Sequence, residues 1–367
     1  MLIRSLKLTH FKNHPELELR FPERICVFTG RNGSGKTNLL DAVHYVGLLR
    51  SAFHREDAQS IQFGESYFRL EAGLEENAKA QRLVVFCERD QKKRVEWNGK
   101  QAERMSDHLG KFPLVLILPD EPFRMNESAD WRRGLMDNVL SQGVEGYVAE
   151  LARFKRLLNQ RNALLRYFSE GRRYDSLLLD SLDHDLAAAA SAVFRLRQEH
   201  LPDLNRRLQK EYRLLSSGRE EAELTYESEL ERIPAAELLQ SRRQADLEAG
   251  RTTAGLQRDD FDYLLNGKQL RKFASQGQQK TYLLALKFAF CGFLSERLQK
   301  APCLLLDDVF DKLDDERIAG LIRRICAEDV GQVFISDARE GGARCCCTCR
   351  CCRRCQRQQR AWQWTGH

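Results

Sequence analysis

The chain has 367 residues, 42% of them apolar and 31% charged, enough to build two or three domains or one large core with an insertion. Its formal net charge is +6, but residues 341–367 hold six arginines and no acidic residue, so the remainder balances at 53 basic and 53 acidic residues. This balance excludes a global positive field, and any nucleic-acid binding must come from a local basic face. The longest apolar run, 112–118, is too short to span a bilayer, so we expect a cytoplasmic protein.

Short segments of alternating apolar residues dominate residues 1–120. They predict strands at 2–8, 16–21, 24–29, 67–74, 81–88, 94–97 and 115–118. Asn98-Gly99 follows one of these strands and is a hairpin signal. The pattern favours an α/β head in which an antiparallel β lobe flanks a nucleotide-binding sheet.

A phosphate-binding loop is the most specific motif of the chain. Residues 30–37 fit G-x-x-x-x-G-K-S/T, after a predicted strand and before a predicted helix. In that geometry backbone N–H groups and the helix N-terminus face phosphate oxygens, Lys36 reaches the β/γ-phosphates, and the Thr37 hydroxyl can bind Mg²⁺. The expected nucleoside triphosphate contacts are Gly30, Arg31, Asn32, Gly33, Ser34, Gly35, Lys36, Thr37 and Asn38.

The apolar period becomes helical from about residue 130. One stripe runs through 147–168 with Arg161 interrupting it, and a second runs through 182–215, where Pro202 predicts a kink or a helix break. Two long helices joined by a short polar turn are expected to pack antiparallel. They could be a functional arm or only an inter-domain spacer.

The first of these helices carries the best local basic segment. Its cations are Arg153, Lys155, Arg156, Arg161, Arg166, Arg172 and Arg173, opposed between 151 and 174 only by Glu170. They could neutralise DNA phosphates, or they could be a solvated helix face. No aromatic platform or helix-turn-helix stands out, so DNA contact would be independent of sequence.

An apolar strand at 303–306 ends in two carboxylates. Asp307 is the expected Mg²⁺ ligand, and Asp308 is the expected catalytic base that orients or deprotonates the attacking water. About 270 residues separate Asp307 from Lys36. The nucleotide site would therefore be assembled from the two ends of the chain.

This layout is similar to ABC-type ATPase heads of the SMC group, in which a helical segment interrupts the head. That resemblance implies a signature loop, and Ser275, Gln276 and Gly277 open a predicted helix, 277–298, before the second motif. In the family such a loop contacts the γ-phosphate of ATP held by a partner subunit. Residues 311–314 resemble the D-loop that packs across the same interface.

Further segments resemble one group in this class, the bacterial DNA repair proteins of the RecF family. They are residues 6–13, 36–42, 51–55, 131–137, 257–261, 265–267, 274–280 and 305–310. The Ser-Gln-Gly-Gln-Gln run at 275–279 and the Leu-Asp-Asp-Val-Phe run at 306–310 are the most diagnostic. The chain departs from the family at Leu256-Gln257, where Pro-His is usual. It also has Ser336-Asp337 where many ABC ATPases have a switch histidine, and it lacks the last strand and helix beyond Arg339.

The resemblance implies an SMC-type P-loop ATPase head of mixed sheet plus antiparallel β lobe, with an inserted helical arm. We assign 1–122 and 245–340 to the head, 123–244 to the arm and 341–367 to a tail. It implies ATP and Mg²⁺ as cofactors, a DNA-binding homodimer that forms on ATP, and cooperation with RecO and RecR in loading recombinase at gaps. Catalysis would be slow, DNA-dependent ATP hydrolysis using Lys36, Asp308 and the partner's Ser275, since Asp308 is shorter than the usual glutamate.

Two other functions use part of the same motifs. The ATPase subunit of a membrane transporter shares the P-loop, signature and second carboxylate motif, but gives no role to residues 6–13 or to the arm. A small-molecule kinase needs only the P-loop.

The cysteines fall into two groups. Five are scattered through apolar stretches, as in a protein of a reducing compartment, while seven lie between 345 and 355. We expect that second region to be unstructured low-complexity sequence, such as a shifted reading frame. A zinc site built from its two C-x-x-C pairs is the alternative.

Overall fold

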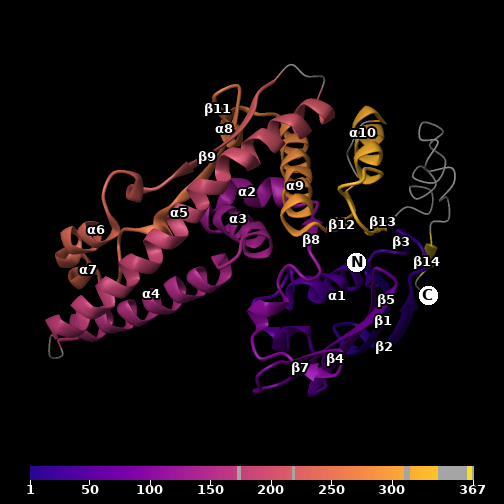
Figure 1. Ribbon diagram of the computed structural model, residues 1–367, viewed down its shortest axis with the longest axis horizontal. Helices are drawn as coiled ribbons and strands as arrows, with labels where there is room; N and C mark the ends of the chain where they lie inside the picture. The colour runs from indigo at the N-terminus through magenta and orange to yellow at the C-terminus, as the bar shows by residue number, and fades with distance from the viewer. Residues whose placement is uncertain (172–174, 217–219, 310–314, 338–361, 366–367) are drawn as a thin grey trace. The chain divides into compact units, whose positions relative to one another are not determined.

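The computed structural model describes residues 1–171, 175–216, 220–309, 315–337 and 362–365 (Figure 1). They fall into two compact units, each described below by itself. The first contains residues 1–121, 213–218 and 280–367, and the second contains 122–212 and 219–279. This division places 245–279 with the helical region, whereas the sequence analysis assigned them to the head. The reason is the antiparallel pairing of β10 (Asp260–Leu265) with β9 (Ala222–Glu227).

A five-stranded parallel sheet organises the first unit. Its order is β14-β3-β13-β12-β8, formed by Trp362–Thr365, Ile25–Thr29, Val333–Asp337, Cys303–Asp307 and Leu114–Ile117. Every residue of β12 and β13 is buried, as expected for a parallel sheet covered on both faces. Parallel pairing aligns Asp307 with Ser336, so the carboxyl end of β12 meets that of β13.

A six-stranded antiparallel sheet forms the other half of the first unit. Its order is β2-β1-β4-β5-β6-β7, formed by His14–Arg20, Leu2–Phe11, Tyr67–Glu76, Lys79–Glu88, Arg94–Trp97 and Lys100–Gln101. Trp97 pairs with Lys100, which confirms the hairpin predicted at Asn98-Gly99. Alternating residues of β1 and β4 pack with α1 (Lys36–Leu48) in one apolar core that includes Leu8, Leu70 and Tyr45. The strands predicted for this region are confirmed to within a few residues.

Besides α1, the described residues of the first unit form two 3-10 helices, one further α-helix and most of a second one. They are η1 (Asp57–Ser60), η2 (Met105–His108), α9 (Gln276–Leu298, which begins in the second unit) and α10 (Asp315–Ile325). The α9 helix confirms the one predicted at 277–298. Among the described helices, none is both long enough and apolar enough to cross a membrane.

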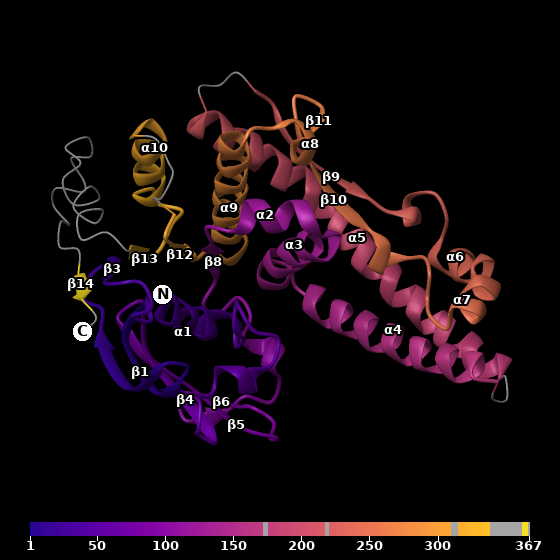
Figure 2. The same cartoon turned by 180° about the vertical axis from the view of Figure 1, so that it is seen from behind.

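Long helices dominate the second unit. Its elements are α2 (Glu121–Glu127), α3 (Ala129–Gly143), α4 (Tyr147–Ser169), α5 (Ser176–Leu215), β9, η3 (Glu229–Glu231), α6 (Ala235–Ser241), α7 (Arg243–Ala249), η4 (Leu256–Arg258), β10, β11 (Lys268–Gln269) and α8 (Leu270–Phe273). The α4 and α5 helices run side by side (Figure 2). The α5 helix continues through Pro202 without the predicted break. Burial of Leu204, Leu208 and Tyr212 beyond the proline offsets the lost backbone hydrogen bond.

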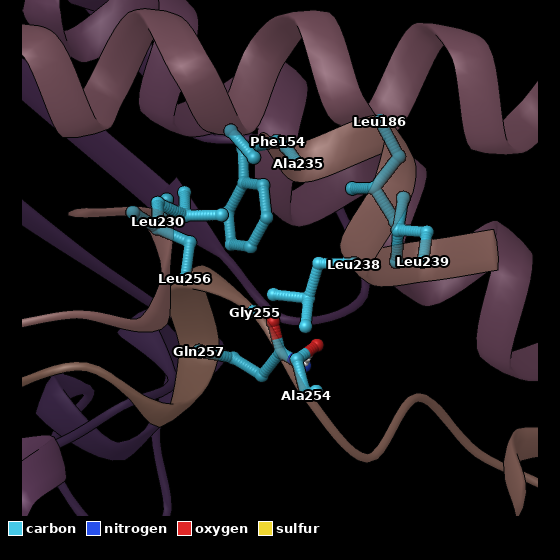
Figure 3. A pocket seen from close by; sticks show the side chains of 11 residues that line it. Phe154, Leu186, Leu230, Ala235, Leu238, Leu239, Ala254, Gly255, Leu256 and Gln257 are labelled. Carbon is cyan, nitrogen blue, oxygen red and sulfur yellow. Dashed lines mark hydrogen bonds between the residues drawn. The ribbon is translucent and has the colours of Figure 1, made fainter. Parts of the chain in front are cut away.

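A small, mainly apolar pocket lies in the second unit (Figure 3). Phe154, Leu186, Leu238 and Leu256 line it, and Gln257 is its one lining residue with a polar side chain. The Gln257 Nε2 donates to the Ala254 carbonyl at 2.8 Å, so the residue that stands where the family usually has histidine holds its own loop.

Four residues of the tail region form a strand, although no strand was predicted beyond Arg339. Strand β14 extends the parallel sheet beside β3, with Trp362 opposite Cys26. The crowded cysteines at 345–355, and with them the alternative of a zinc site, lie outside the described residues. Within the described residues, no group of three or more histidine, cysteine or acidic side chains could hold a metal ion.

Candidate nucleotide-binding site

The predicted phosphate-binding loop connects β3 to α1 at the carboxyl edge of the parallel sheet. Gly35 caps α1 with φ 95°, a left-handed conformation that favours glycine. It also has no room for a side chain, because a Cβ atom there would lie 2.5 Å from Asn13 Nδ2 and 2.8 Å from His14 Cε1. The close approach of the β1–β2 hairpin therefore requires the glycine of the motif.

Lys36 occupies the first turn of α1 and is 5% exposed. Its Nζ donates to the carbonyl oxygens of Gly30 at 2.8 Å and Arg31 at 3.0 Å. The ammonium thus lies against the loop that precedes it, where it can exchange these neutral acceptors for phosphate oxygens.

Thr37 and Asp307 meet at the sheet edge although they come from opposite ends of the chain. The Thr37 hydroxyl lies 3.1 Å from both Asp307 carboxylate oxygens. Burial raises the pKa of the Asp307 carboxyl, whereas hydrogen bonds from Ser336 and Thr37 act in the opposite direction. A hydroxyl and a carboxylate with only oxygen donors fit the ligand preference of Mg²⁺.

Ser336 holds both acidic residues of β12 and its following turn. Its hydroxyl donates to Asp307 Oδ1, and its carbonyl and hydroxyl oxygens accept from the Asp308 backbone N–H at 3.2 and 3.1 Å. Asp308 has φ 45°, an uncommon conformation for a residue other than glycine. In the sequence, Ser336 stands out only as a departure from a switch histidine. The parallel register with β12 gives it this contact.

Asn13 and His14, at the tip of the β1–β2 hairpin, also contact the loop and were not predicted as site residues. Asn38 Nδ2 donates to Asn13 Oδ1 at 2.7 Å, and His14 Nε2 lies 3.3 Å from the Gly35 carbonyl oxygen. Burial lowers the pKa of His14. Asn13 ends the 6–13 segment, which carried a resemblance but no assigned role, and His14 lies just beyond that segment.

Lys12 anchors the start of the same hairpin. Its Nζ lies 2.6 Å from Asp41 on α1, and both side chains are buried. Asp41 in turn accepts from the Ser51 hydroxyl at 2.7 Å. This chain of contacts holds segment 51–55 against α1.

Ser275, Gln276 and Gly277 belong to the second unit, whereas Lys36, Thr37, Asp307 and Asp308 belong to the first. Ser275 forms a reciprocal cap with Gln278: its backbone N–H donates to Gln278 Oε1 at 2.7 Å, and its hydroxyl accepts from the Gln278 N–H at 3.3 Å. Both Ser275 and Gln276 are exposed at the start of the 23-residue helix α9. The D-loop candidate 311–314 lies outside the described residues.

The basic segment of α4 divides by burial. Arg161 is fully buried and pairs at 2.6 Å with both Asp183 and Asp246, so the expectation that it could contact phosphates is wrong. Arg153 lies 3.4 Å from Asp185. Arg156 and Arg166 are exposed, while Arg172 and Arg173 lie outside the described residues.

Comparisons with known proteins agree with this geometry. A family model described as the RecF/RecN/SMC N terminal domain matches residues 2–349. The DNA replication and repair protein RecF of Cytophaga hutchinsonii is 37% identical over 339 residues, covering 92% of this chain and 90% of the relative. The RecF of Flavobacterium johnsoniae is 35% identical over 337 residues, covering 92% of this chain and 94% of the relative.

Solved structures of RecF and of an Smc head also resemble this chain. The recombination mediator protein RecF-ATP in the RecFOR pathway superposes with a TM-score of 0.84 at 26% identity, over 93% of this chain and 92% of that chain. An Smc head bound to the C-winged helix domain of ScpA, at 17% identity and a TM-score of 0.54, shares the fold. The predicted mixed α/β head of the SMC type is confirmed, and the transporter and kinase alternatives lose their support. The chain belongs to the RecF family of DNA replication and repair proteins.

Proposed function

We propose that the chain binds ATP with Mg²⁺ and uses the nucleotide to form a homodimer that clamps DNA at gaps during recombinational repair in the cytoplasm. The observation that carries the proposal is the meeting of Thr37 and Asp307 at 3.1 Å beside Lys36. A hydroxyl, a carboxylate and an ammonium at one sheet edge form a site for a metal-bound triphosphate. The 26% identical RecF structure that is described with ATP supports the choice of nucleotide.

Thr37 and Asp307 would hold the Mg²⁺ ion, which would neutralise charge on the phosphate oxygens. Lys36 would bind the β- and γ-phosphates, and the backbone of residues 30–35 would contact their remaining oxygens. Asp308 would orient the attacking water and accept its proton. Its carboxylate is one methylene shorter than that of glutamate, so hydrolysis would be slow and would serve to release the dimer from DNA.

Ser275 of one chain would face the γ-phosphate held by Lys36 of the other. Its exposure at the N-terminus of α9 supports this role, because the positive end of the helix dipole attracts anions. The cap with Gln278 leaves the Ser275 hydroxyl proton free to donate. Two such composite sites would join two heads around two ATP molecules.

DNA contact would be independent of sequence, and exposed Arg156 and Arg166 on α4 are the arm residues that we assign to it. DNA binding and the partners RecO and RecR come from the family resemblance. They would act together in loading recombinase at a gap.

The test combines ATP affinity with dimerisation, measured by light scattering with and without ATP on gapped duplex. Lys36→Met should reduce ATP binding itself. Ser275→Arg should preserve ATP binding and abolish ATP-driven dimerisation, while Ser241→Arg, which adds the same cation at another exposed serine of the second unit, should leave both unchanged. Dimerisation by the Ser275→Arg variant at the wild-type ATP concentration would refute the composite site.

A further inference from the structure

Phe63 has the most exposed large apolar side chain among the described residues, at 100%. A single exposed apolar residue is common on protein surfaces and does not by itself indicate a site. Two further observations suggest a role for the exposed ring. They are the conformation of the turn that contains Phe63 and the hydrogen bonds that connect this turn to β1.

Phe63 lies at the corner of a tight turn. The Glu65 N–H donates to the Gln62 carbonyl at 3.0 Å, and Gly64, the third residue of the turn, has φ +88°. These are the hydrogen bond and the positive φ of a type II turn, in which the third position favours glycine. The second position directs its side chain away from the turn, so the Phe63 ring projects outward from an ordered backbone.

The turn is bonded to the end of β1. Gln62 N–H donates to the His10 carbonyl at 2.8 Å, and Lys12 N–H donates to the Ser60 carbonyl at 2.9 Å. Between these bonds Phe11 forms an antiparallel bridge with Ile61. The turn therefore cannot move independently of the strand.

The residues that follow β1, in the turn to β2 and at the start of β2, reach the phosphate-binding loop. Asn13 bonds Asn38 at 2.7 Å, and His14 lies 3.3 Å from the Gly35 carbonyl oxygen. His10 and Lys12 have φ of 52° and 53°, so the chain bends sharply between the end of β1 and the turn at Lys12 and Asn13. One short piece of backbone thus links the exposed ring to the loop proposed to hold the triphosphate, all within the first unit.

We propose that Phe63 stacks on the base of the nucleotide whose phosphates Lys36 and Thr37 hold. This inference rests on the proposed function and names the base contact of the same site. An aromatic ring offers a flat apolar surface to the π-face of any base, so its contribution is insensitive to the identity of the base. Phe63 would therefore strengthen binding of ATP and GTP alike, and selection between them would come from other residues.

The experiment measures the affinities of full-length variants for ATP, GTP and inorganic tripolyphosphate, each with Mg²⁺. F63A should weaken ATP and GTP about tenfold and leave tripolyphosphate unchanged. F63W should retain ATP affinity, and its additional indole should change fluorescence with ATP and not with tripolyphosphate. F123A removes a phenylalanine that is 67% exposed on α2 in the other unit, and should have no effect.

Equal ATP affinity of F63A and the wild type would overturn the proposal, and so would an equal loss of ATP and tripolyphosphate. In the first case Phe63 would instead contact a protein or DNA partner. The proposed function fails by a different result, namely that Lys36→Met leaves binding of all three ligands unchanged. Thermal unfolding of F63A should match the wild type, because the side chain buries nothing.

Discussion

The two units join distant parts of the chain by strand pairing and by buried ion pairs, but strand pairing dominates the first unit and arginine ion pairs are more prominent in the second. In the first, backbone ladders place residue 304 between residues 115 and 333 and align Asp307 with Ser336. In the second, buried arginines bind carboxylates far away in sequence: Arg161 binds Asp246, and Arg197 binds Asp137 at 2.8 Å. The alternating pattern of a strand helps to predict which residues pair in a ladder. The sequence around a buried arginine does not indicate which distant carboxylate it will pair with.

The cations of the basic helix α4 differ in exposure, so they cannot all contribute to a DNA-binding surface. Arg156, Arg161 and Arg166 lie five residues apart on α4, yet Arg161 is fully buried and the other two are exposed. Arg161 also bonds the Thr252 hydroxyl at 2.8 Å, so it connects α4 with the segment after α7. Counting cations along a helix therefore overstates the surface that is available to DNA.

The largest effect is expected from breaking the Arg161 cluster. Arg161→Met should lower the free energy of unfolding of the second unit by about 3–5 kcal/mol, because Asp246 would stay buried without its arginine and Asp183 would keep only Arg243. Denaturant unfolding measures the loss, and hydrogen exchange shows which unit carries it. The control Arg156→Met, at an exposed position of the same helix, should change stability by no more than about 0.5 kcal/mol. Equal stability of the two variants would contradict the assigned role.

The second largest effect is expected from pH, which should change the stability of the two units in opposite directions. In the first unit, burial lowers the pKa values of His44 and His108 to about 4. Between their ordinary value of about 6.5 and about 4, the unfolded chain binds protons that the folded chain does not, so stability falls as pH falls. In the second unit, burial raises the pKa of Asp259 to about 6, so its folded form binds the extra proton and stability rises as pH falls from about 6 to about 4.

Hydrogen exchange at pH 7 and pH 5, corrected for intrinsic rates, measures this divergence. Each histidine should contribute a slope of up to about 1.4 kcal/mol per pH unit to the first unit. His108→Gln should flatten the dependence of the first unit, and Asp259→Asn should flatten that of the second. Parallel pH profiles of the two units would refute the assignment of these groups.

The smallest effect is expected at the surface of α4. The double variant Arg156→Gln/Arg166→Gln should weaken duplex binding several-fold for all sequences and reduce the salt slope by about 2, since each lost phosphate contact removes about one released counterion. Arg20→Gln, at an exposed position of β2 in the first unit, is the control for loss of a surface arginine outside α4 and should leave the salt slope unchanged. An unchanged salt slope in the double variant would remove α4 from the DNA-binding surface.

Local rules explain why much of the fold could be predicted. Strand alternation and the Asn-Gly turn at 98–99 depend on neighbours in sequence, and the structure has the strands predicted in residues 1–120 and this hairpin. The G-x-x-x-x-G-K-S/T spacing likewise located a loop between β3 and α1 with its lysine in the first helical turn. Family membership was predicted from motif order and is confirmed over 92% of the chain.

Several contacts of the nucleotide-binding site could not be predicted, because they depend on the pairing of segments that are distant in sequence. The register of β12 beside β13 gives Asp307 its Ser336 partner, and the folding of the β1–β2 hairpin over Gly35 brings Asn13 and His14 to the loop. Neither contact has a signal in a single segment, because each partner alone is an ordinary polar residue at the end of a strand.

The sequence by itself determined the phosphate-binding loop, the carboxylates after a buried strand and the helical region between them, because short-range periodicity and turn chemistry encode each one. Tertiary structure alone decided that Arg161 is a buried cross-link, that residues 245–279 join the helical unit, and that Ser336 holds both acids. Burial and charge pairing depend on which segments meet, and that is set by the packing of the whole chain.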